Sequence, residues 1–125
     1  MIHHVSIGVR DVATAKRFYD AVFEPLGYRA LSQSADALGY GRDEPALWIM
    51  AVECPVPAHD QSGLHFCFEA PTRTSVDAFY AAALAFGGRD NGKPGLRMDY
   101  GPNYYTAFVV DPDGYRLEAY CSSFS

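Results

Sequence analysis

An internal repeat constrains the fold of this chain more than any other feature of its sequence. His4-Val5-Ser6-Ile7-Gly8-Val9 aligns with His65-Phe66-Cys67-Phe68-Glu69-Ala70 at an offset of 61 residues. At the same offset, and without a gap, Phe18-Tyr19 aligns with Phe79-Tyr80. A duplicated module explains this self-similarity, and duplication places equivalent residues at symmetric positions. His4 and His65 are therefore a candidate pair of metal ligands.

The size and composition of the chain suit a single domain. Its 125 residues are 49% hydrophobic, which is enough apolar material for a packed core. The repeat divides this domain into module one, about residues 1–53, and module two, about residues 64–125. Residues 54–63 between them contain Pro55, Pro57 and Gly63, a composition that favours a linker over a strand or helix.

Charge, cysteine content and hydropathy argue against several classes of protein. The net charge is −5 and the 10 Lys and Arg residues are scattered, so neither a nucleic acid nor an anionic membrane is an expected partner. The three cysteines are widely spaced and contain no Cys-x-x-Cys pair, so we expect them to be reduced and to serve in packing; they are Cys54, Cys67 and Cys121. The absence of a long apolar run and of a basic-then-apolar leader predicts a cytoplasmic location. A small molecule is the expected ligand.

Module one is predicted to fold in the order β-α-β-β-β. Residues 3–9 alternate apolar and polar side chains with the period of a half-buried strand. Asp11 is a suitable cap for the following helix, which is expected to end at Gly27. Three short strands are then predicted, at residues 28–32, 37–40 and 47–52.

Module two repeats this order. A strand over residues 64–69 precedes a helix over about 75–86, with a cap from Thr72, Thr74 or Ser75. Residues 90–103 contain several Gly and Pro and predict a long loop or an irregular strand. The final hairpin is predicted from strands 104–110 and 115–120, joined by the turn sequence Asp111-Pro112-Asp113-Gly114.

Strand alternation groups the chemically active side chains. His65, Cys67 and Glu69 share one face of their predicted strand, and Glu118 lies on a strand just after the tight turn. His4, His65 and Glu118 together form a set of two imidazoles and one carboxylate. Such a set suits Fe(II), Mn, Ni, Co or Zn and leaves positions open for water and substrate.

Each of these residues also has an ordinary structural explanation. A single His on a strand usually makes a structural hydrogen bond, and a single strand Glu usually lies in solvent. The coincidence of His4 and His65 at the repeat offset favours the metal interpretation. His3 and His59 are expected at the surface. Cys67 and Glu69 are left out of the ligand set, because a soft thiolate matches N and O ligands poorly.

Four motifs of this chain resemble those of the vicinal oxygen chelate superfamily. That superfamily includes glyoxalase I, the extradiol dioxygenases, methylmalonyl-CoA epimerase, fosfomycin-resistance thiol transferases and bleomycin-binding proteins. The motifs are Ile2-His3-His4-Val5-Ser6-Ile7-Gly8-Val9-Arg10-Asp11, Phe18-Tyr19 with Leu26-Gly27, Gly63-Leu64-His65-Phe66, and Asp111-Pro112-Asp113-Gly114-Tyr115-Arg116-Leu117-Glu118. They span nearly the whole chain and are less specific for one activity than for the superfamily.

The resemblance implies an α+β fold in which two paired βαβββ modules form a curled mixed sheet around a cleft. It implies one divalent metal ion, of Zn, Ni, Mn, Fe or Co, held by His4, His65 and Glu118, with Glu118 also acting in catalysis. It further implies a homodimer, with the possibility that His4 comes from one subunit and His65 and Glu118 from the other.

One ligand of glyoxalase I and of the epimerase has no counterpart here. In those enzymes a fourth ligand comes from the last strand of the first module, and matching Leu47-Trp48-Ile49-Met50 to that strand puts Ile49 in its place. Isoleucine cannot coordinate a metal. The remaining three ligands are similar to those of the extradiol dioxygenases and the fosfomycin-resistance transferases. The loss also removes a proton-transfer base, which argues against the glyoxalase reaction itself.

Three functions are compatible with this sequence. The first is a divalent-metal enzyme of the lyase or isomerase type, acting on a small oxygen-chelating substrate. The second is a metal-free binding protein of the bleomycin-resistance type, suggested by Ile49 and the negative charge. The third is a thiol transferase of the fosfomycin-resistance type, suggested by the three-ligand set. Candidate pocket residues are Ser6, Trp48, Arg97, Asn103, Tyr104 and Tyr105.

Overall fold

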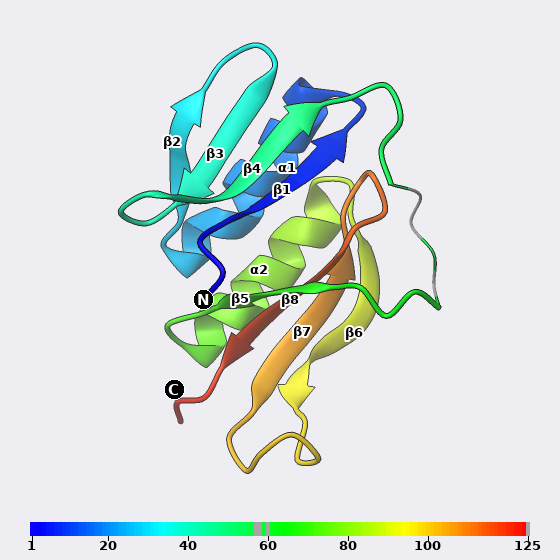
Figure 1. Ribbon diagram of the computed structural model, residues 1–125. Coiled ribbons are helices and arrows are strands. Elements are labelled where there is room, and N and C mark those ends of the chain that lie inside the picture. Colours follow the sequence, from blue (N-terminus) through cyan, green and yellow to red (C-terminus); the bar gives the residue numbers. More distant parts are fainter. Residues whose placement is uncertain (57–58, 60, 125) are drawn as a thin grey trace.

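Two four-stranded mixed sheets and two α-helices make up the fold (Figure 1). The computed structural model describes residues 1–56, 59 and 61–124. The first sheet contains β1 (Val5–Val9), β2 (Arg29–Gln33), β3 (Ala37–Gly41) and β4 (Pro45–Ala51), in the order β1-β4-β3-β2. The second contains β5 (Phe66–Glu69), β6 (Arg89–Leu96), β7 (Tyr105–Val110) and β8 (Arg116–Cys121), in the order β5-β8-β7-β6. The two modules therefore share one topology.

The predicted α+β class with paired βαβββ modules is confirmed, although the two sheets do not close on each other. In each sheet the first strand of the module pairs in parallel with the last, and the remaining pairs are antiparallel. β1 and β5 are consequently edge strands. Within the described part of the chain, no helix is long and apolar enough to cross a membrane.

Both predicted helices are present, with their ends shifted by a few residues. α1 (Val12–Phe23) is capped by Asp11, whose side chain accepts a hydrogen bond from the amide of Ala13. It continues into the short 3-10 helix η1 (Glu24–Leu26), which ends at Gly27 with φ of 85°, a left-handed conformation that glycine adopts without strain. α2 (Arg73–Ala85) is capped by Thr72.

One expectation about the strands needs correction, and for another the structure decides between the two alternatives. The strand expected from residue 64 begins only at Phe66, so His65 lies just before β5. Residues 89–96 form strand β6 with shifts of register around Gly92, which is the irregular strand rather than the long loop. Pro94 is tolerated because β6 is an edge strand. In the predicted linker, residues 57, 58 and 60 lie outside the described residues, and the others lie outside helices and strands.

One hydrophobic core spans both modules. The helices pack against each other behind the sheets, and each sheet turns its other face away from them (Figure 1). Phe18 and Phe79, which the repeat aligns, are both completely buried. This arrangement leaves alternate residues of each strand on an open face, where the site described below lies.

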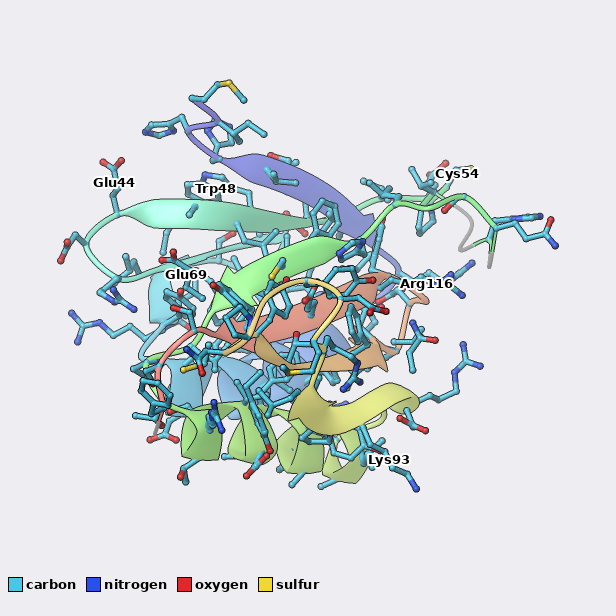
Figure 2. The ribbon with its side chains drawn as sticks, turned by 90° about the horizontal axis from the view of Figure 1, so that it is seen from below. Glu44, Trp48, Cys54, Glu69, Lys93 and Arg116 are labelled. Atoms are coloured by element: carbon cyan, nitrogen blue, oxygen red, sulfur yellow. The ribbon has the colours of Figure 1, made fainter. Side chains whose placement is uncertain are left out.

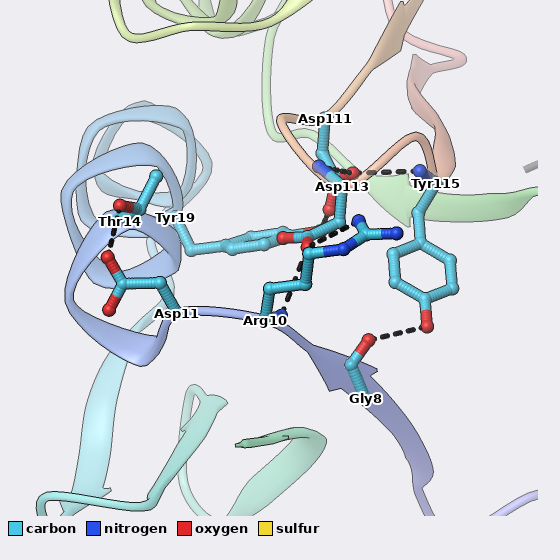
Figure 3. Close-up of polar contacts among 8 residues, drawn as sticks. All are labelled: Gly8, Arg10, Asp11, Thr14, Tyr19, Asp111, Asp113 and Tyr115. Carbon is cyan, nitrogen blue, oxygen red and sulfur yellow. Dashed lines mark hydrogen bonds and ion pairs between the residues drawn. The ribbon is translucent and has the colours of Figure 1, made fainter. Parts of the chain in front are cut away.

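Polar contacts join the predicted turn of residues 111–114 to module one (Figure 3). Tyr19 of α1 donates a hydrogen bond of 2.5 Å to Asp111 Oδ2, and Asp111 is only 3% exposed. The other oxygen, Oδ1, accepts from the amides of Asp113 and Tyr115 at 2.9 and 2.7 Å. Tyr115 in turn donates to the carbonyl of Gly8 in β1 at 2.6 Å. The turn thus fixes the position of module one relative to β7 and β8.

Candidate metal and substrate site

His65 and Glu118 lie together on the open face of the second sheet. His65 Nε2 is 3.0 Å from Glu118 Oε1. The two meet because β5 pairs in parallel with β8, with Cys67 opposite Glu118, and His65 precedes β5 on the same face as Cys67. The structure therefore brings together two of the three predicted ligands.

The Glu118 carboxylate is buried and held by its neighbours. The residue is only 3% exposed. Its second oxygen, Oε2, accepts a hydrogen bond from Tyr104 Oη at 2.8 Å, and Thr106 Oγ1 lies 2.7 Å away. The single Thr106 hydroxyl proton is shared, since the Ala119 carbonyl is also 2.8 Å from Oγ1. These contacts offset part of the cost of burying a carboxylate and leave Oε1 directed at His65.

Cys67 also belongs to this cluster, although it is not one of the predicted ligands. The residue is exposed at the sheet surface, yet desolvation of its sulfur, followed by the charge of Glu118, raises the pKa of the thiol to about 12. Burial and the neighbouring Glu118 also raise the pKa of the Tyr104 phenol. Both groups therefore stay neutral near pH 7, and Tyr104 acts as a hydrogen-bond donor to Glu118.

Aromatic side chains surround the pair. The Tyr104 ring stacks on Tyr120 with centroids 4.2 Å apart, and Tyr100 meets Tyr104 edge-on at 5.2 Å. Phe108 lies opposite Glu118 in the β7–β8 register. Its ring meets the His65 ring edge-on, with the ring centroids 6.1 Å apart. An open aromatic surface next to a polar pair suits a small ligand with a flat or apolar part.

The predicted pocket residues of module two lie in different places in the structure. Tyr104 lies in the site, and Arg97 places its guanidinium over the Phe108 ring at 5.8 Å. Asn103 is partly buried just before β7. Tyr105 was wrongly assigned, because its hydroxyl donates to Asp77 of α2 at 2.6 Å. Successive residues of a strand point to opposite faces, so Tyr104 on the open face places Tyr105 on the helix side.

Thr106, Phe108 and Tyr120 are further residues of this site that were not predicted from the sequence. A signal for them was present in the hairpin. The turn pairs Val110 with Arg116, and counting back along the two strands pairs Phe108 with Glu118 and Thr106 with Tyr120. All of these positions lie on the face of Glu118 by strand alternation.

His4, the third predicted ligand, lies apart from the other two in a separate group. It is exposed just before β1, and its Nδ1 is 2.9 Å from Nδ1 of His3. His3 Nε2 is 3.0 Å from Glu44 Oε1. His3 is exposed as expected, but it also has two side-chain partners. Among the residues that the structure describes, no group of three or more His, Cys, Asp or Glu is arranged to hold a metal.

Strand register corrects the expected counterpart of Glu118 in module one. The repeat aligns Ser6 with Cys67, β1 pairs Ser6 with Trp48, and β5 pairs Cys67 with Glu118. Trp48 therefore occupies the place that had been given to Ile49. Ile49 is fully buried on the core side. Neither residue can coordinate a metal, so the absence of a fourth ligand at this position is unchanged.

A cavity of about 700 Å³ next to His65 is lined by residues of both modules. Ile2 and Glu44 line it on the side of module one, and on the side of module two it is lined by His65, just before β5, and by Cys67 of β5. Figure 2 shows Glu44 and Glu69, both of which line this cavity, toward the same side of the molecule. Its volume falls within the range of small-molecule sites, about 300 to 1,000 Å³. A smaller hollow of about 380 Å³ adjoins His65, Phe108 and Arg116.

Comparison with known proteins gives one consistent family. The sequence model of the Glyoxalase/Bleomycin resistance protein/Dioxygenase superfamily matches residues 1–119. The uncharacterized protein YqjT of Bacillus subtilis (strain 168) is 25% identical over 122 residues, which cover 94% of this chain and 95% of that protein.

Solved structures agree with this match. A glyoxalase/bleomycin resistance protein from Albidiferax ferrireducens T118 is 29% identical, with a TM-score of 0.81 over 96% of this chain and 97% of that chain. The fosfomycin resistance protein FosX from Mesorhizobium loti is 17% identical, with a TM-score of 0.70 over 97% of this chain and 91% of that chain, and shares the fold. With a family match that extends over residues 1–119, this chain belongs to the glyoxalase/bleomycin resistance protein/dioxygenase superfamily.

Proposed function

We propose that this protein is a divalent-metal-dependent enzyme of the lyase or isomerase type that acts on a small oxygen-chelating substrate. The observation that carries the proposal is the separation of 3.0 Å between His65 Nε2 and Glu118 Oε1 on an open, aromatic-lined face. Tyr104 and Thr106 hold the other carboxylate oxygen, so the atom that faces His65 is well defined.

The residues present fit such a metal ion. Imidazole nitrogen and carboxylate oxygen are the donors that Zn, Ni, Mn, Fe and Co accept. His65 Nε2 and Glu118 Oε1, which lie 3.0 Å apart, are the two atoms of this pair that would hold the ion. When bound, the ion supplies a Lewis acid for two neighbouring oxygens of the substrate.

The remaining chemistry falls to side chains of the chain itself. Glu118 Oε1 is the proposed acceptor for a substrate proton, because Tyr104 and Thr106 contact the other carboxylate oxygen and not this one. Tyr104 holds Oε2 as a neutral donor, and Cys67 is a neutral thiol rather than a nucleophile. The stacked rings of Tyr104 and Tyr120 orient the substrate and exclude water from one side.

The third ligand in this proposal is His4 of a second copy. His65 lines the cavity of about 700 Å³ and His4 is not among the residues that line it, and β1 and β5 are both edge strands with one unpaired side. A homodimer in which module one of each chain faces module two of the other would complete both sites. Each dimer would then hold two metal ions.

A metal-free binding protein is the second candidate. Here the hydrogen bond between His65 and Glu118 satisfies both groups without a metal, and the aromatic face and the 700 Å³ cavity bind the ligand. This function predicts that neither a chelator nor His65→Ala changes ligand affinity. The likeness to FosX concerns the fold and does not favour a thiol transferase.

Metal content distinguishes the two candidates. We would measure transition metals by elemental analysis in protein as isolated and after loading with each of the five metals. The proposal expects about one ion per chain, lost in Glu118→Ala and in His65→Ala but retained in Glu53→Ala, which removes an exposed carboxylate elsewhere. Absence of metal from the wild-type protein after loading would overturn it.

A further inference from the structure

We propose that the hollow of about 380 Å³ beside His65 is a carboxylate-binding subsite, with Arg116 as the residue that recognises the anion. The substrate would then be a small oxygen chelator that also carries a carboxylate. This inference rests on the proposed function, because it names the substrate class of the same site. Arg116 was not among the pocket residues predicted from the sequence.

Strand pairing places Arg116 next to His65. β5 runs parallel to β8, and their register begins with Phe66 opposite Leu117. His65 and Arg116 are the residues just before this pair, so they lie side by side. Arg116 is two residues before Glu118 on β8 and therefore shares its open face. The register thus places a permanent positive charge beside the proposed metal pair.

A bulge in β6 supplies a second polar group. Asp90 pairs with Val109 and Gly92 pairs with Phe108, so two steps along β6 correspond to one step along β7. Asn91 is the extra residue of this bulge, and it lines the hollow. A bulge re-aims a side chain that regular pairing would place elsewhere, and an Asn amide has two N–H donors.

The hollow combines polar groups with a flat apolar wall. The Phe108 ring forms this wall and meets the His65 ring edge-on. Arg97 places its guanidinium over the same Phe108 ring at 5.8 Å, which adds a second positive charge nearby. The described residues that line the hollow are Gly63, Leu64, His65, Asn91, Phe108 and Arg116.

The charge of this lining favours an anion. Among the described lining residues there is no Asp or Glu, although the chain has 15 of them and a net charge of −5. Glu118, the neighbouring carboxylate on β8, is only 3% exposed. Glu44 and Glu69 line the larger cavity, and Figure 2 shows them on the other side of the molecule from Arg116. The hollow is therefore locally positive in a chain that is negative overall.

Arginine suits a carboxylate in particular. Its planar guanidinium carries five N–H donors in a fixed fork that matches the two oxygens of a carboxylate. Arg116 uses part of this capacity within the fold, since its Nη1 lies 3.4 Å from the carbonyl oxygen of His59. One guanidinium can serve several acceptors, so a contact within the fold is compatible with binding a ligand.

His65 connects the hollow to the proposed metal pair. It lines the hollow, and its Nε2 is 3.0 Å from Glu118 Oε1. A carboxylate held by Arg116 would therefore lie next to the chelating oxygens of the substrate. Tyr120 follows Arg116 and Glu118 on the same face of β8, so the aromatic surface lies beyond the metal pair. Anchoring one end of the substrate in this way fixes its orientation.

Benzoate and benzamide are matched probes of this subsite, because they differ in charge and have nearly the same shape. We would titrate each into metal-free protein near pH 7, where benzoate is ionised, and record ¹H–¹⁵N spectra. Benzoate should shift the amide signals of Leu64 and Asn91 with a dissociation constant in the millimolar range, and benzamide should bind roughly 10-fold more weakly. Equal affinities of the two probes, or shifts confined to residues elsewhere, would overturn the inference.

Three variants test the assignment of residues. Arg116→Gln removes the guanidinium and should weaken benzoate binding roughly 10-fold. Arg29→Gln, at an exposed position of β2, changes the net charge equally and should leave the affinity unchanged. Asn91→Asp adds a carboxylate at the exposed bulge and should also weaken binding, which keeps the test valid if Arg116→Gln fails to fold. Unchanged affinity in both Arg116→Gln and Asn91→Asp would overturn the inference.

The use of metal-free protein separates this inference from the proposed function. Benzoate binding at the hollow, in a protein that takes up no metal after loading, would overturn the metal enzyme and support the carboxylate subsite. Metal content as proposed, without discrimination between benzoate and benzamide, would overturn only the subsite.

Discussion

The phenol of Tyr104 donates a hydrogen bond of 2.8 Å to Oε2 of Glu118, from the residue just before β7 to the middle of β8. With Thr106 on the same oxygen, this contact sets the orientation of a carboxylate that is 3% exposed. Neighbours that hold one oxygen of a carboxylate leave the other oxygen for a metal or a substrate proton. The hydrogen bond between Tyr104 and Glu118 therefore supports the role proposed for the Glu118 carboxylate.

Removing the Tyr104 hydroxyl should lower both the affinity for zinc and the free energy of unfolding. In Tyr104→Phe, Glu118 loses one hydrogen bond to Oε2, and we expect zinc affinity to fall roughly 10-fold and stability to fall by about 1 kcal/mol. Isothermal titration and urea denaturation measure the two effects. Tyr105→Phe is a matched control, because Tyr105 loses only a hydrogen bond to Asp77 on the helix side. Equal zinc affinities in the two variants would contradict the role given to Tyr104.

The thiol of Cys67 should react slowly despite its exposure. A pKa of about 12 leaves on the order of 1 in 10⁴ of these thiols ionised at pH 8, against about a quarter for an ordinary cysteine. We expect alkylation by iodoacetamide about 10³-fold slower than for a free cysteine, followed by mass spectrometry of the modified peptide. Cys54 serves as an exposed internal reference.

The charge of Glu118 is one cause of this raised pKa. Glu118→Gln removes that charge, so Cys67 alkylation should become faster in this variant. A rate for Cys67 as fast as that of a free cysteine in the wild type would show that Glu118 and burial do not suppress its ionisation.

Burial of Asp111 should make stability depend on pH. Desolvation raises the pKa of this carboxyl to about 6, although Tyr19 and the amides of Tyr115 and Asp113 act in the opposite direction. A pKa that is higher in the folded state means that the folded protein binds more protons between about pH 4 and 6. The stability that Asp111 contributes is therefore complete below about pH 4 and is lost as the pH rises to 6.

Asp111→Asn should remove this part of the pH dependence. Its carbonyl oxygen can keep the two backbone donors, and its NH₂ can donate to Tyr19, whose hydroxyl reverses its role. The free energy of unfolding of the variant, relative to wild type, should rise by up to roughly 3 kcal/mol between pH 4 and 6.5. Urea denaturation at several pH values measures this difference. Asp36→Asn, at an exposed position, should give a flat difference, and a flat difference for Asp111→Asn would contradict the assignment.

Local sequence rules predicted most of the fold. The caps at Asp11 and Thr72, the stop at Gly27 and the hairpin turn at residues 111–114 each depend on a few neighbouring residues, and all are present in the structure. The exact start of β5 was missed by two residues, since strand ends depend on pairing with another strand. Tyr104 and Tyr105 cannot both lie in the site, because neighbouring residues of a strand point to opposite faces of the sheet, and Tyr105 points to the helix side.

The candidate site was less predictable, because it depends on register and on long-range contacts. The alignment of Ile49 with Glu118 was wrong by one position, and only the pairing of Ser6 with Trp48 reveals it. The separation of His4 from His65 depends on how the two modules pack, which the repeat does not encode. The equal positions of two histidines in a repeat predict that they are equivalent, but they do not predict that they are close.

The repeat nevertheless makes a clear prediction for the core, because Phe18 and Phe79 occupy equivalent places and are both completely buried. Each is expected to contribute equally to stability, so Phe18→Ala and Phe79→Ala should each lower the free energy of unfolding by about 3 to 5 kcal/mol. Phe86→Ala is a control just after α2, where half of the side chain is exposed, and should cost well under half as much. Urea denaturation gives the three values. If one of the two buried substitutions cost no more than Phe86→Ala, the modules would not share the core symmetrically.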